Sequence, residues 1–526
     1  MLAGLIGHDP WKADEPYVFG TVEGVLETGD WIVPRVAGEP FVEKPPLYAV
    51  TGALLARLAA PWLPPHDGAR LATGVFLALA CIAVGAAARN AWGPGSSRYA
   101  VLALVANLGL VAHAHAMLPD VPVLTGVAFA AWGFALLPGR PLGAGWLIGT
   151  GAGLSFMAKG LLAPAAIGCT AVLLPLLFAG WRRRAYAIAM LMALCSVVPW
   201  VLVWPIKLHA ISPPLFDEWF WLNNIGRFTG SSVPVLGAAH AAGEWPRTLP
   251  WFTFPSLPLA LLMLWSKRNE LMDSPPVQYC LVTSGVIMAA LVVSASARDN
   301  YALPLLAPLA ILATPAATAL PARIDKGWAA AAAILFGALA AAVWIAWMAA
   351  TASDGASRAL SGALPLSFFR TRPQVAPVAA ALALTVVAIA VPLAHRSPGQ
   401  GLIAWVAGLS LCWGLLLFLW EPWLDASKSY RGMFLSMGGT MPAAHCVASR
   451  GMGESERAML HYVLHIDTRR VEVDPGSARD CDLLLVQGVA AVPPDELASP
   501  QWRAIWNGAR LADRRERFWL FARAPG

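Results

Sequence analysis

The segment Asp14-Glu15, followed by Gly29-Asp30-Trp31 and then by Glu43-Lys44-Pro45-Pro46-Leu47, stands directly before a long hydrophobic region. A membrane protein rarely keeps several charged side chains beside its first membrane helix without a partner or a function for them. The segment therefore predicts a polytopic membrane fold and a site of chemistry at the membrane surface.

The composition is that of an integral membrane protein. The chain has 526 residues, of which 58% are hydrophobic and 13% are charged, whereas globular domains carry about 25% charged residues. The net charge of +6 encodes topology in such a protein, so it does not indicate nucleic-acid binding. The sequence contains no phosphate-binding P-loop and no glycine-rich dinucleotide loop, which argues against ATP or NAD chemistry.

Twelve apolar runs are long enough to span a bilayer, at about 17 to 25 residues each. They lie near 70–89, 98–117, 120–138, 143–159, 161–179, 186–206, 248–266, 277–296, 301–319, 328–350, 374–394 and 401–420. The stretch 47–62 is ambiguous, because it is short, contains Arg57 and ends in a proline-rich segment.

The distribution of Lys and Arg resolves the ambiguity, since cytoplasmic connections carry more of these residues. If 47–62 does not span, one set of connections collects Arg89, Arg98, Arg140, Arg182-Arg183-Arg184, Lys267-Arg268, Arg323 and Lys326. The opposite set holds the first polar segment, Asp120, Lys159, the 207–247 loop, Arg298, the 351–373 loop and the tail. We therefore predict that 47–62 is an interfacial helix and that the second set faces the periplasm.

These arguments divide the chain into three parts. Residues 1–69 form a first periplasmic loop with juxtamembrane helices, 70–424 form the polytopic membrane domain, and 425–526 form a small soluble α/β domain in the periplasm. Met1 to Gly7 is too short for a signal peptide, so we expect one further helix before the start of this sequence.

The tail shows short apolar runs typical of strands. They are His445-Cys446-Val447-Ala448, Val471-Glu472-Val473, Leu483-Leu484-Leu485-Val486 and Phe518-Trp519-Leu520-Phe521. A helix is predicted between them, from Glu454 to Leu464. Cys446 and Cys481 lie in this tail and would pair if it is exported, although the sequence leaves their separation open.

Three acidic residues of the outward set are candidates for chemistry. Asp14 and Glu15 precede Pro16, where a helix is expected to begin, so capping explains them as well as general-base or metal-binding roles do. Asp120 follows Leu118-Pro119 at a helix start and has the same two interpretations.

The basic and aromatic candidates lie on the same predicted side. Lys44 follows Glu43, and the pair forms either a local ion pair or a lipid-phosphate site. Lys159 stands at a helix end, where snorkelling is the usual reason for a lysine. Arg227 lies among aromatic residues and suits either phosphate contacts or interfacial anchoring, and Arg298 and Tyr301 at the mouth of another span offer further donors.

The string Asp14-Glu15…Gly29-Asp30-Trp31-Ile32-Val33-Pro34…Gly38…Phe41…Glu43-Lys44-Pro45-Pro46-Leu47-Tyr48 resembles the first outward loop of lipid A aminoarabinose transferases. It is also similar to that of bacterial proteins of the protein O-mannosyltransferase class. Both are GT-C glycosyltransferases. Further matches are Leu118-Pro119-Asp120, Met157-Ala158-Lys159-Gly160, Pro199-Trp200, Phe220-Trp221…Arg227-Phe228 and Arg298…Tyr301…Leu303-Pro304.

The resemblance implies thirteen membrane helices, two juxtamembrane helices and a periplasmic C-terminal domain. It implies transfer of a sugar from a polyprenyl-phosphate donor to a lipid, glycan or protein acceptor outside the cytoplasmic membrane. By motif position Asp14 and Asp120 are the catalytic carboxylates, while the substrate-binding residues are Glu15, Lys44, Lys159, Arg227, Arg298 and Tyr301. Glu43 stands at a divalent-metal position, but Asn224 replaces the expected histidine, so dependence on a metal ion stays open.

Two other classes of protein compete with an enzyme. A transporter or flippase for a lipid-linked sugar predicts charges in the middle of the helices, whereas the charges here gather at one set of helix ends. A non-catalytic scaffold that binds a partner through its tail would not turn over a donor. The choice of sugar and acceptor is open.

Overall fold

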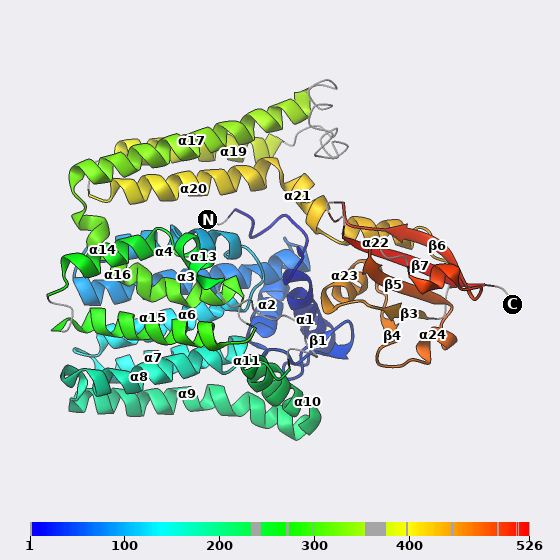
Figure 1. The fold of residues 1–526 in the computed structure, drawn as a ribbon, viewed down its shortest axis with the longest axis horizontal. Helices are drawn as coiled ribbons and strands as arrows, with labels where there is room; N and C mark the ends of the chain where they lie inside the picture. Colours follow the sequence, from blue (N-terminus) through cyan, green and yellow to red (C-terminus); the bar gives the residue numbers. More distant parts are fainter. Residues whose placement is uncertain are drawn as a thin grey trace.

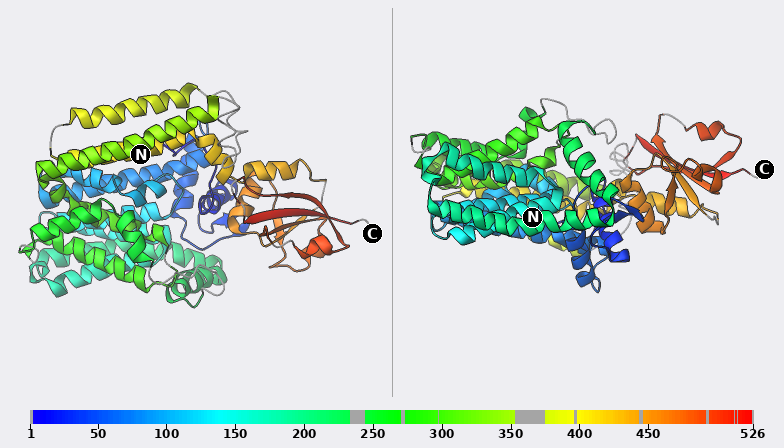
Figure 2. Two further views of the ribbon diagram at one scale, coloured as in Figure 1. Left: turned by 45° about the horizontal axis from the view of Figure 1, so that its top comes forward. Right: turned by 90° about the horizontal axis from the view of Figure 1, so that it is seen from below.

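The computed structural model describes residues 3–232, 244–269, 273–296, 298–352, 375–395, 398–442, 446–491, 494–511, 513 and 515–524. Most of its helices lie side by side in one bundle, and the C-terminal sheet projects from one end of that bundle (Figures 1 and 2). Helices α1 and α10 lie at the same end as the sheet (Figure 1). Of the two long predicted loops, residues 233–243 and 353–373 are outside the described ranges.

The elements before the bundle are α1 (Glu15–Thr28), β1 (Arg35–Val36), β2 (Glu39–Pro40) and α2 (Leu47–Ala59). The bundle contains α3 (Pro65–Trp92), α4 (Ser96–Val105), α5 (Leu108–His113), α6 (Asp120–Leu136), α7 (Pro141–Lys159), α8 (Leu162–Leu177), η1 (Ala179–Trp181), α9 (Arg184–Ile211), α10 (Pro213–Asp217), η2 (Glu218–Gly226), α11 (Arg227–Thr229), α13 (Trp245–Phe252), α14 (Ser256–Ser266), α15 (Pro275–Val293), η4 (Asp299–Leu305), α16 (Leu306–Ala319), α17 (Ala322–Ala352), α19 (Val375–Ala394) and α20 (Gln400–Leu419). The tail contains α21 (Glu421–Lys428), α22 (Arg431–Gly438), β3 (Val447–Arg450), α23 (Glu454–Leu464), β4 (Thr468–Arg470), α24 (Ser477–Asp480), β5 (Leu483–Val489), η6 (Asp495–Ala498), β6 (Trp502–Gly508) and β7 (Glu516–Arg523).

The bundle is that of a multi-pass membrane protein. Within the described ranges, seven helices are long and apolar enough to cross a bilayer, and the bent pair α13–α14 makes an eighth. Shorter apolar helices of 10–17 residues include α4, α6 and α8. A helix occupies each predicted run, but the count of twelve spans stays a prediction.

Two of the runs are not the continuous helices that the sequence predicts. The run 98–117 is divided into α4 and α5 at Asn107, and the run 248–266 is bent by 88° between α13 and α14. The two breaks meet, since the Leu108 N–H donates to the Phe254 carbonyl over 3.1 Å and the Ser256 hydroxyl to the Ala103 carbonyl over 3.0 Å. Polar groups left free at one break thus find hydrogen-bond partners at the other break. Hydropathy does not reveal this pairing.

Helix α2 is short, as expected of the predicted interfacial helix, whose placement at the membrane stays a prediction. It has 13 residues, which corresponds to about 20 Å at 1.5 Å per residue, well short of a hydrocarbon core of about 30 Å. It packs against α1 and α3, so the first loop is held on the bundle.

The tail forms a five-stranded sheet in the order β4-β3-β5-β7-β6. Strand β3 pairs in parallel with β4 and β5, whereas β7 pairs antiparallel with β5 and β6. Helix α23 covers the predicted residues, and β5 and β7 contain two of the predicted strands. Cys446 and Cys481 form a disulfide with Cα atoms 5.0 Å apart.

Two features of the tail differ from the prediction. Residues 471–473 form a turn after β4, because the Val473 N–H donates back to the Arg470 carbonyl over 3.1 Å. Strand β6 was not predicted, because its residues alternate weakly between exposed and half-buried positions at the edge of the sheet.

Candidate active site

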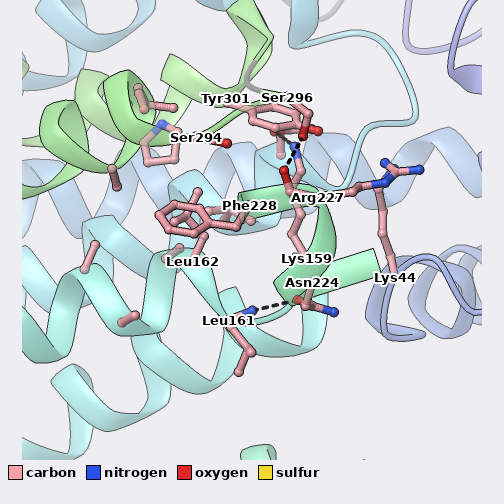
Figure 3. A pocket seen from close by; sticks show the side chains of 18 of the residues that line it. Lys44, Lys159, Leu161, Leu162, Asn224, Arg227, Phe228, Ser294, Ser296 and Tyr301 are labelled. Atoms are coloured by element: carbon pink, nitrogen blue, oxygen red, sulfur yellow. Dashed lines mark hydrogen bonds and ion pairs between the residues drawn. The ribbon is translucent and has the colours of Figure 1, made fainter. Parts of the chain in front are cut away.

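A cavity of about 280 Å³ opens between the first loop and the bundle. Its lining comes from the loop before α2, from α6, α7, α8, η2, α11 and α15, and from η4. Lys44, Lys159, Arg227 and Tyr301 gather at one end, whereas Leu162 and Phe228 lie toward the other (Figure 3). The lining residues are Glu43, Lys44, Asp120, Val123, Lys159, Leu161, Leu162, Ala163, Ala165, Ala166, Asn223, Asn224, Ile225, Arg227, Phe228, Ile287, Ala290, Leu291, Ser294, Ser296, Tyr301 and Pro304.

Glu43 joins two cations at the polar end of the cavity. Its Oε1 lies 3.2 Å from Nζ of Lys44, and its Oε2 lies 3.1 Å from Nη2 of Arg227. Burial alone would raise the pKa of Glu43, but the charges of Lys44 and Arg227 outweigh burial and lower this pKa to about 2. All three groups are therefore charged at neutral pH, and the cluster has a net positive charge.

Lys44 is held from its other side by the first loop. Its ammonium donates to the Tyr17 hydroxyl over 2.6 Å and lies 4.8 Å from the centre of that ring. Burial lowers the pKa of Lys44, but Tyr17, Glu43 and Asp14 raise it well above the ordinary value. Lys44 is a fixed, permanently charged donor rather than a mobile surface lysine.

Asp120 and Lys159 form a second charged group in the cavity lining. The ammonium of Lys159 donates to Oδ1 of Asp120 and lies 3.4 Å from the centre of the Tyr301 ring. The side-chain amide of Asn300 donates to Oδ2 of Asp120 over 3.1 Å. Lys159 therefore pairs with a carboxylate instead of snorkelling, and the side chain of Asp120 caps no helix.

Arg227 presents an unused donor to the site. Its Nη2 binds Glu43, but its buried Nε has no hydrogen-bond partner among the residues that the structure describes. An unsatisfied buried donor costs about 1–3 kcal/mol. This nitrogen is therefore suited to a ligand that brings an anionic oxygen.

Asn224 connects two of the cavity walls. Its Oδ1 accepts from the Leu161 N–H over 3.1 Å, and its Nδ2 donates to the Trp219 carbonyl within η2 over 2.8 Å. A β-carbon at Gly160 would lie 2.1 Å from Oδ1 of Asn224, so this close approach requires glycine. Figure 3 shows the bond from Leu161 to Asn224 directly below the polar end of the cavity.

The other end of the cavity is apolar. Helix α8 contributes Leu162, Ala165 and Ala166, and α15 contributes Ile287 and Leu291. A charged head group and a hydrocarbon chain would each find a matching environment in this single space.

Asp14 lies beside the cavity rather than in its lining. It stands immediately before α1, but its side chain makes no capping hydrogen bond, so the capping interpretation is not supported. Oδ1 lies 3.4 Å from Nη1 of Arg298, and the two side chains are 22% and 50% exposed. The carboxylate is thus accessible and is paired with one half-exposed cation, as a proton acceptor or a ligand for an incoming substrate requires.

Glu15 does not reach the cavity. Its carboxylate is buried and accepts from Arg70 Nε over 3.0 Å and from the backbone N–H groups of Trp11 and Met117, each over 2.9 Å. Burial raises the pKa of Glu15, but Arg70 and the hydrogen bonds lower it below its ordinary value. These contacts give Glu15 a structural role in place of direct substrate contact.

The residues around Glu43 do not fit a divalent metal ion. Both carboxylate oxygens face cations, and the oxygen of Asn224 is used by the Leu161 N–H. A metal ion would add positive charge next to Lys44 and Arg227, and among the described residues no group of three or more His, Cys, Asp or Glu ligand atoms gathers around Glu43. The site therefore has no support for metal binding at Glu43.

Tyr17 and Asn300 were missed by sequence reasoning. Tyr17 lies in α1 and supports Lys44, which is 27 residues away, while Asn300 supports Asp120 from 180 residues away. Asn300 stands between Arg298 and Tyr301, so its position beside two candidates was the available signal. Tyr17 offered no comparable signal.

Comparison with known proteins gives relatives in sequence and in fold. No family model matches the chain. It is 30% identical over 334 residues to an undecaprenyl phosphate-alpha-4-amino-4-deoxy-L-arabinose arabinosyl transferase of Pseudomonas paraeruginosa, covering 59% of this chain and 56% of that protein. A transferase of the same description from Sodalis glossinidius is 28% identical over 331 residues, covering 59% and 55%. The matched part thus spans little more than half of these relatives.

The structural comparison covers nearly the whole chain. ArnT from Cupriavidus metallidurans, bound to undecaprenyl phosphate, matches with a TM-score of 0.71 at 18% identity, over 98% of this chain and 95% of ArnT. The oligosaccharyltransferase of Archaeoglobus fulgidus matches with a TM-score of 0.52 at 10% identity, over 93% and 67%. The fold of this chain is therefore the polytopic membrane fold of ArnT. In sequence, the chain is similar to aminoarabinose arabinosyl transferases.

Proposed function

We propose that this protein transfers a sugar from a polyprenyl-phosphate donor to an acceptor at the periplasmic face of the bacterial inner membrane. The observation that carries the proposal is the single cavity in which Lys44 and Arg227 adjoin an apolar wall of α8 and α15. A polyprenyl phosphate has the same two parts, an anionic head and a long hydrocarbon tail. The names of the relatives support a pentose, 4-amino-4-deoxy-L-arabinose, as the first sugar to test.

The reaction is one displacement at the anomeric carbon of the sugar. An acceptor oxygen forms a bond to this carbon, the bond from the carbon to the phosphate oxygen breaks, and its electron pair leaves with the carrier phosphate. Lys44 and the free Nε of Arg227 stabilise the phosphate as its negative charge grows. Attack from the face opposite to the phosphate inverts the configuration.

Asp14 acts on the acceptor in this proposal. If the acceptor is a hydroxyl group, its proton passes to Asp14, whereas a phosphate of lipid A is already ionised and needs only to be oriented. Asp120, held by Lys159 and Asn300, faces the sugar. Tyr301 lies against Lys159, and Arg298 pairs with Asp14 beside the cavity.

The remaining details of topology belong to the same proposal. The proposal includes a first loop of 1–69, a membrane domain of 70–424 and a soluble domain of 425–526, with the cavity on the periplasmic side. The disulfide of Cys446 and Cys481 supports export of the tail, because such bonds persist in oxidising compartments.

The experiment measures sugar transfer by the full-length protein in membranes that contain the undecaprenyl-phosphate-linked sugar. Mass spectrometry of lipid A, envelope glycans and proteins identifies the product. We expect one acceptor to gain a sugar with the wild type and to gain it much more slowly with Asp14→Asn, whereas the exposed control Asp217→Asn should retain full activity. Movement of the donor across the membrane without any glycosylated product would contradict the proposal and favour the flippase alternative.

A further inference from the structure

Glu23, Glu27 and His461 form a cluster outside the cavity. Glu23 and Glu27 stand one turn apart on α1, and His461 lies on α23 of the tail domain. The ligand atoms of these three side chains all lie within 4.8 Å of one another. The cluster therefore joins the first loop to the tail domain through three groups that commonly bind metal ions.

A fourth residue orients the imidazole. Nε2 of His461 lies 2.9 Å from Oε1 of Glu27, and Nδ1 lies 2.8 Å from Oδ1 of Asp467. Metal-binding histidines usually bind the ion through one nitrogen while the other donates to a carboxylate, which fixes the ring. Asp467 is placed to accept from Nδ1 when Nε2 binds an ion.

The charges of the cluster are not balanced by protein groups. Three carboxylates surround one imidazole, and Glu23 makes no hydrogen bond and no ion pair within 4.0 Å in the described part of the chain. Arg457 and Arg470, from the same domain, are engaged by Glu39 at 2.7 and 3.4 Å. A partly buried carboxylate without a partner is costly.

The two helices already stand at the separation that a shared ion needs. A β-carbon at Gly20 would lie 2.8 Å from Cβ of Ala458, so α1 and α23 are in close contact. The Ser455 hydroxyl donates to the Ala13 carbonyl over 2.8 Å at the start of both helices. Figure 1 shows α1 and α23 next to each other where the bundle meets the sheet.

We infer that Glu23, Glu27 and His461 bind a divalent transition-metal ion, with zinc as the best match, and that Asp467 orients His461. Zinc accepts imidazole and carboxylate ligands at about 2.0–2.2 Å, so the ligand atoms need only a small closure. Two carboxylates balance the charge of the ion, and the bound ion would clamp the first loop to the tail domain. This inference does not depend on the sugar-transfer reaction.

Zinc binding to the full-length protein in detergent, freed of its affinity tag and of metal by a chelator, tests the inference. We expect isothermal titration calorimetry to show one equivalent of Zn²⁺ that Glu23→Gln and His461→Gln each lose. Asp467→Asn should bind Zn²⁺ about 10- to 100-fold more weakly. The matched control is His465→Asn, because His465 lies at the end of the same helix, outside the cluster, and asparagine tolerates its positive φ of 55°.

The inference is overturned if the wild type takes up no zinc, or if Glu23→Gln and His461→Gln bind it with wild-type stoichiometry and affinity.

Discussion

Nε of Arg70 donates to Oε1 of Glu15 over 3.0 Å, and both side chains are buried. The same guanidinium donates to Asp67 over 2.7 Å and to the carbonyls of His8 and Asp9. Oε1 of Glu15 also accepts from the N–H of Met117, which begins the segment leading to Asp120. This ion pair therefore fixes the positions of both candidate carboxylates, since Asp14 is the neighbour of Glu15.

Removing Arg70 should destabilise the fold. Arg70→Ala leaves two carboxylates buried without their cation, which costs about 3–5 kcal/mol. Thermal or denaturant unfolding in detergent measures the loss. The control is Arg35→Ala, because Arg35 makes one exposed hydrogen bond to Gly38 and should cost less than about 1 kcal/mol. Equal effects of the two substitutions would show that the buried pair does not hold the first loop.

Lys44 and Arg227 should control donor affinity. A charge-assisted hydrogen bond contributes about 1.5–3 kcal/mol, so Lys44→Ala or Arg227→Ala should weaken donor binding about 10- to 100-fold. Binding of undecaprenyl phosphate to the purified protein measures this directly. Lys12→Ala is a suitable control, because Lys12 pairs with Glu516 away from the cavity. Unchanged affinity in both cavity variants would show that the donor phosphate binds elsewhere.

Asp14→Asn should lower turnover while the protein stays folded. General-base catalysis contributes about 10²- to 10⁴-fold, and asparagine keeps the shape of the side chain. The decrease should appear in kcat rather than in donor affinity, because Asp14 does not line the cavity. It should be smaller if the acceptor is an ionised phosphate. A wild-type kcat in Asp14→Asn would show that the Asp14 carboxylate has no role in the reaction.

Acid should destabilise the folded protein by protonating Glu43 at the polar end of the cavity. The pKa of Glu43 is lowered to about 2 by Lys44 and Arg227, so the folded state holds this proton less tightly than the unfolded chain does. The contribution of Glu43 to the free energy of unfolding is fully present above the unfolded pKa of about 4.3. This contribution is lost as the pH falls through about 2. The contribution is at most about 3 kcal/mol.

The pH dependence can be assigned by substitution. Glu43→Gln should lower the free energy of unfolding at neutral pH and should flatten its decline between about pH 5 and 2. Unfolding at a series of pH values compares the variant with the wild type. An unchanged acid profile in Glu43→Gln would assign the decline to other carboxylates.

The disulfide should stabilise the tail domain. Cys446 and Cys481 are separated by 35 residues, and closing such a loop in the unfolded chain corresponds to about 3–4 kcal/mol. Replacing both cysteines by serine should make the tail more sensitive to protease, whereas Cys169→Ser, at an exposed free cysteine, should have no effect. Equal proteolysis of the two proteins would show that the bond contributes little to stability.

Local sequence predicted those elements that local chemistry controls. The helix Glu454–Leu464 and the strands at Leu483 and Phe518 were correct because their apolar periodicity reflects burial on one face. The turn at 471–473 and the breaks between α4 and α5 and between α13 and α14 were missed. Each of these depends on a hydrogen bond to a neighbouring element or turn, which periodicity does not record.

The string from Asp14 to Tyr48 and the hydropathy of the chain determined by themselves the membrane class, the GT-C resemblance and most of the candidate residues. Only the tertiary structure decided which candidates act together. It placed Lys159 on Asp120, Arg227 on Glu43 and Arg70 on Glu15, at separations of 39, 184 and 55 residues. It also brought His461 to Glu27 across 434 residues. Such partners are set by how the helices and the tail domain pack, because a side chain's sequence neighbours do not specify which distant charge will share its buried environment.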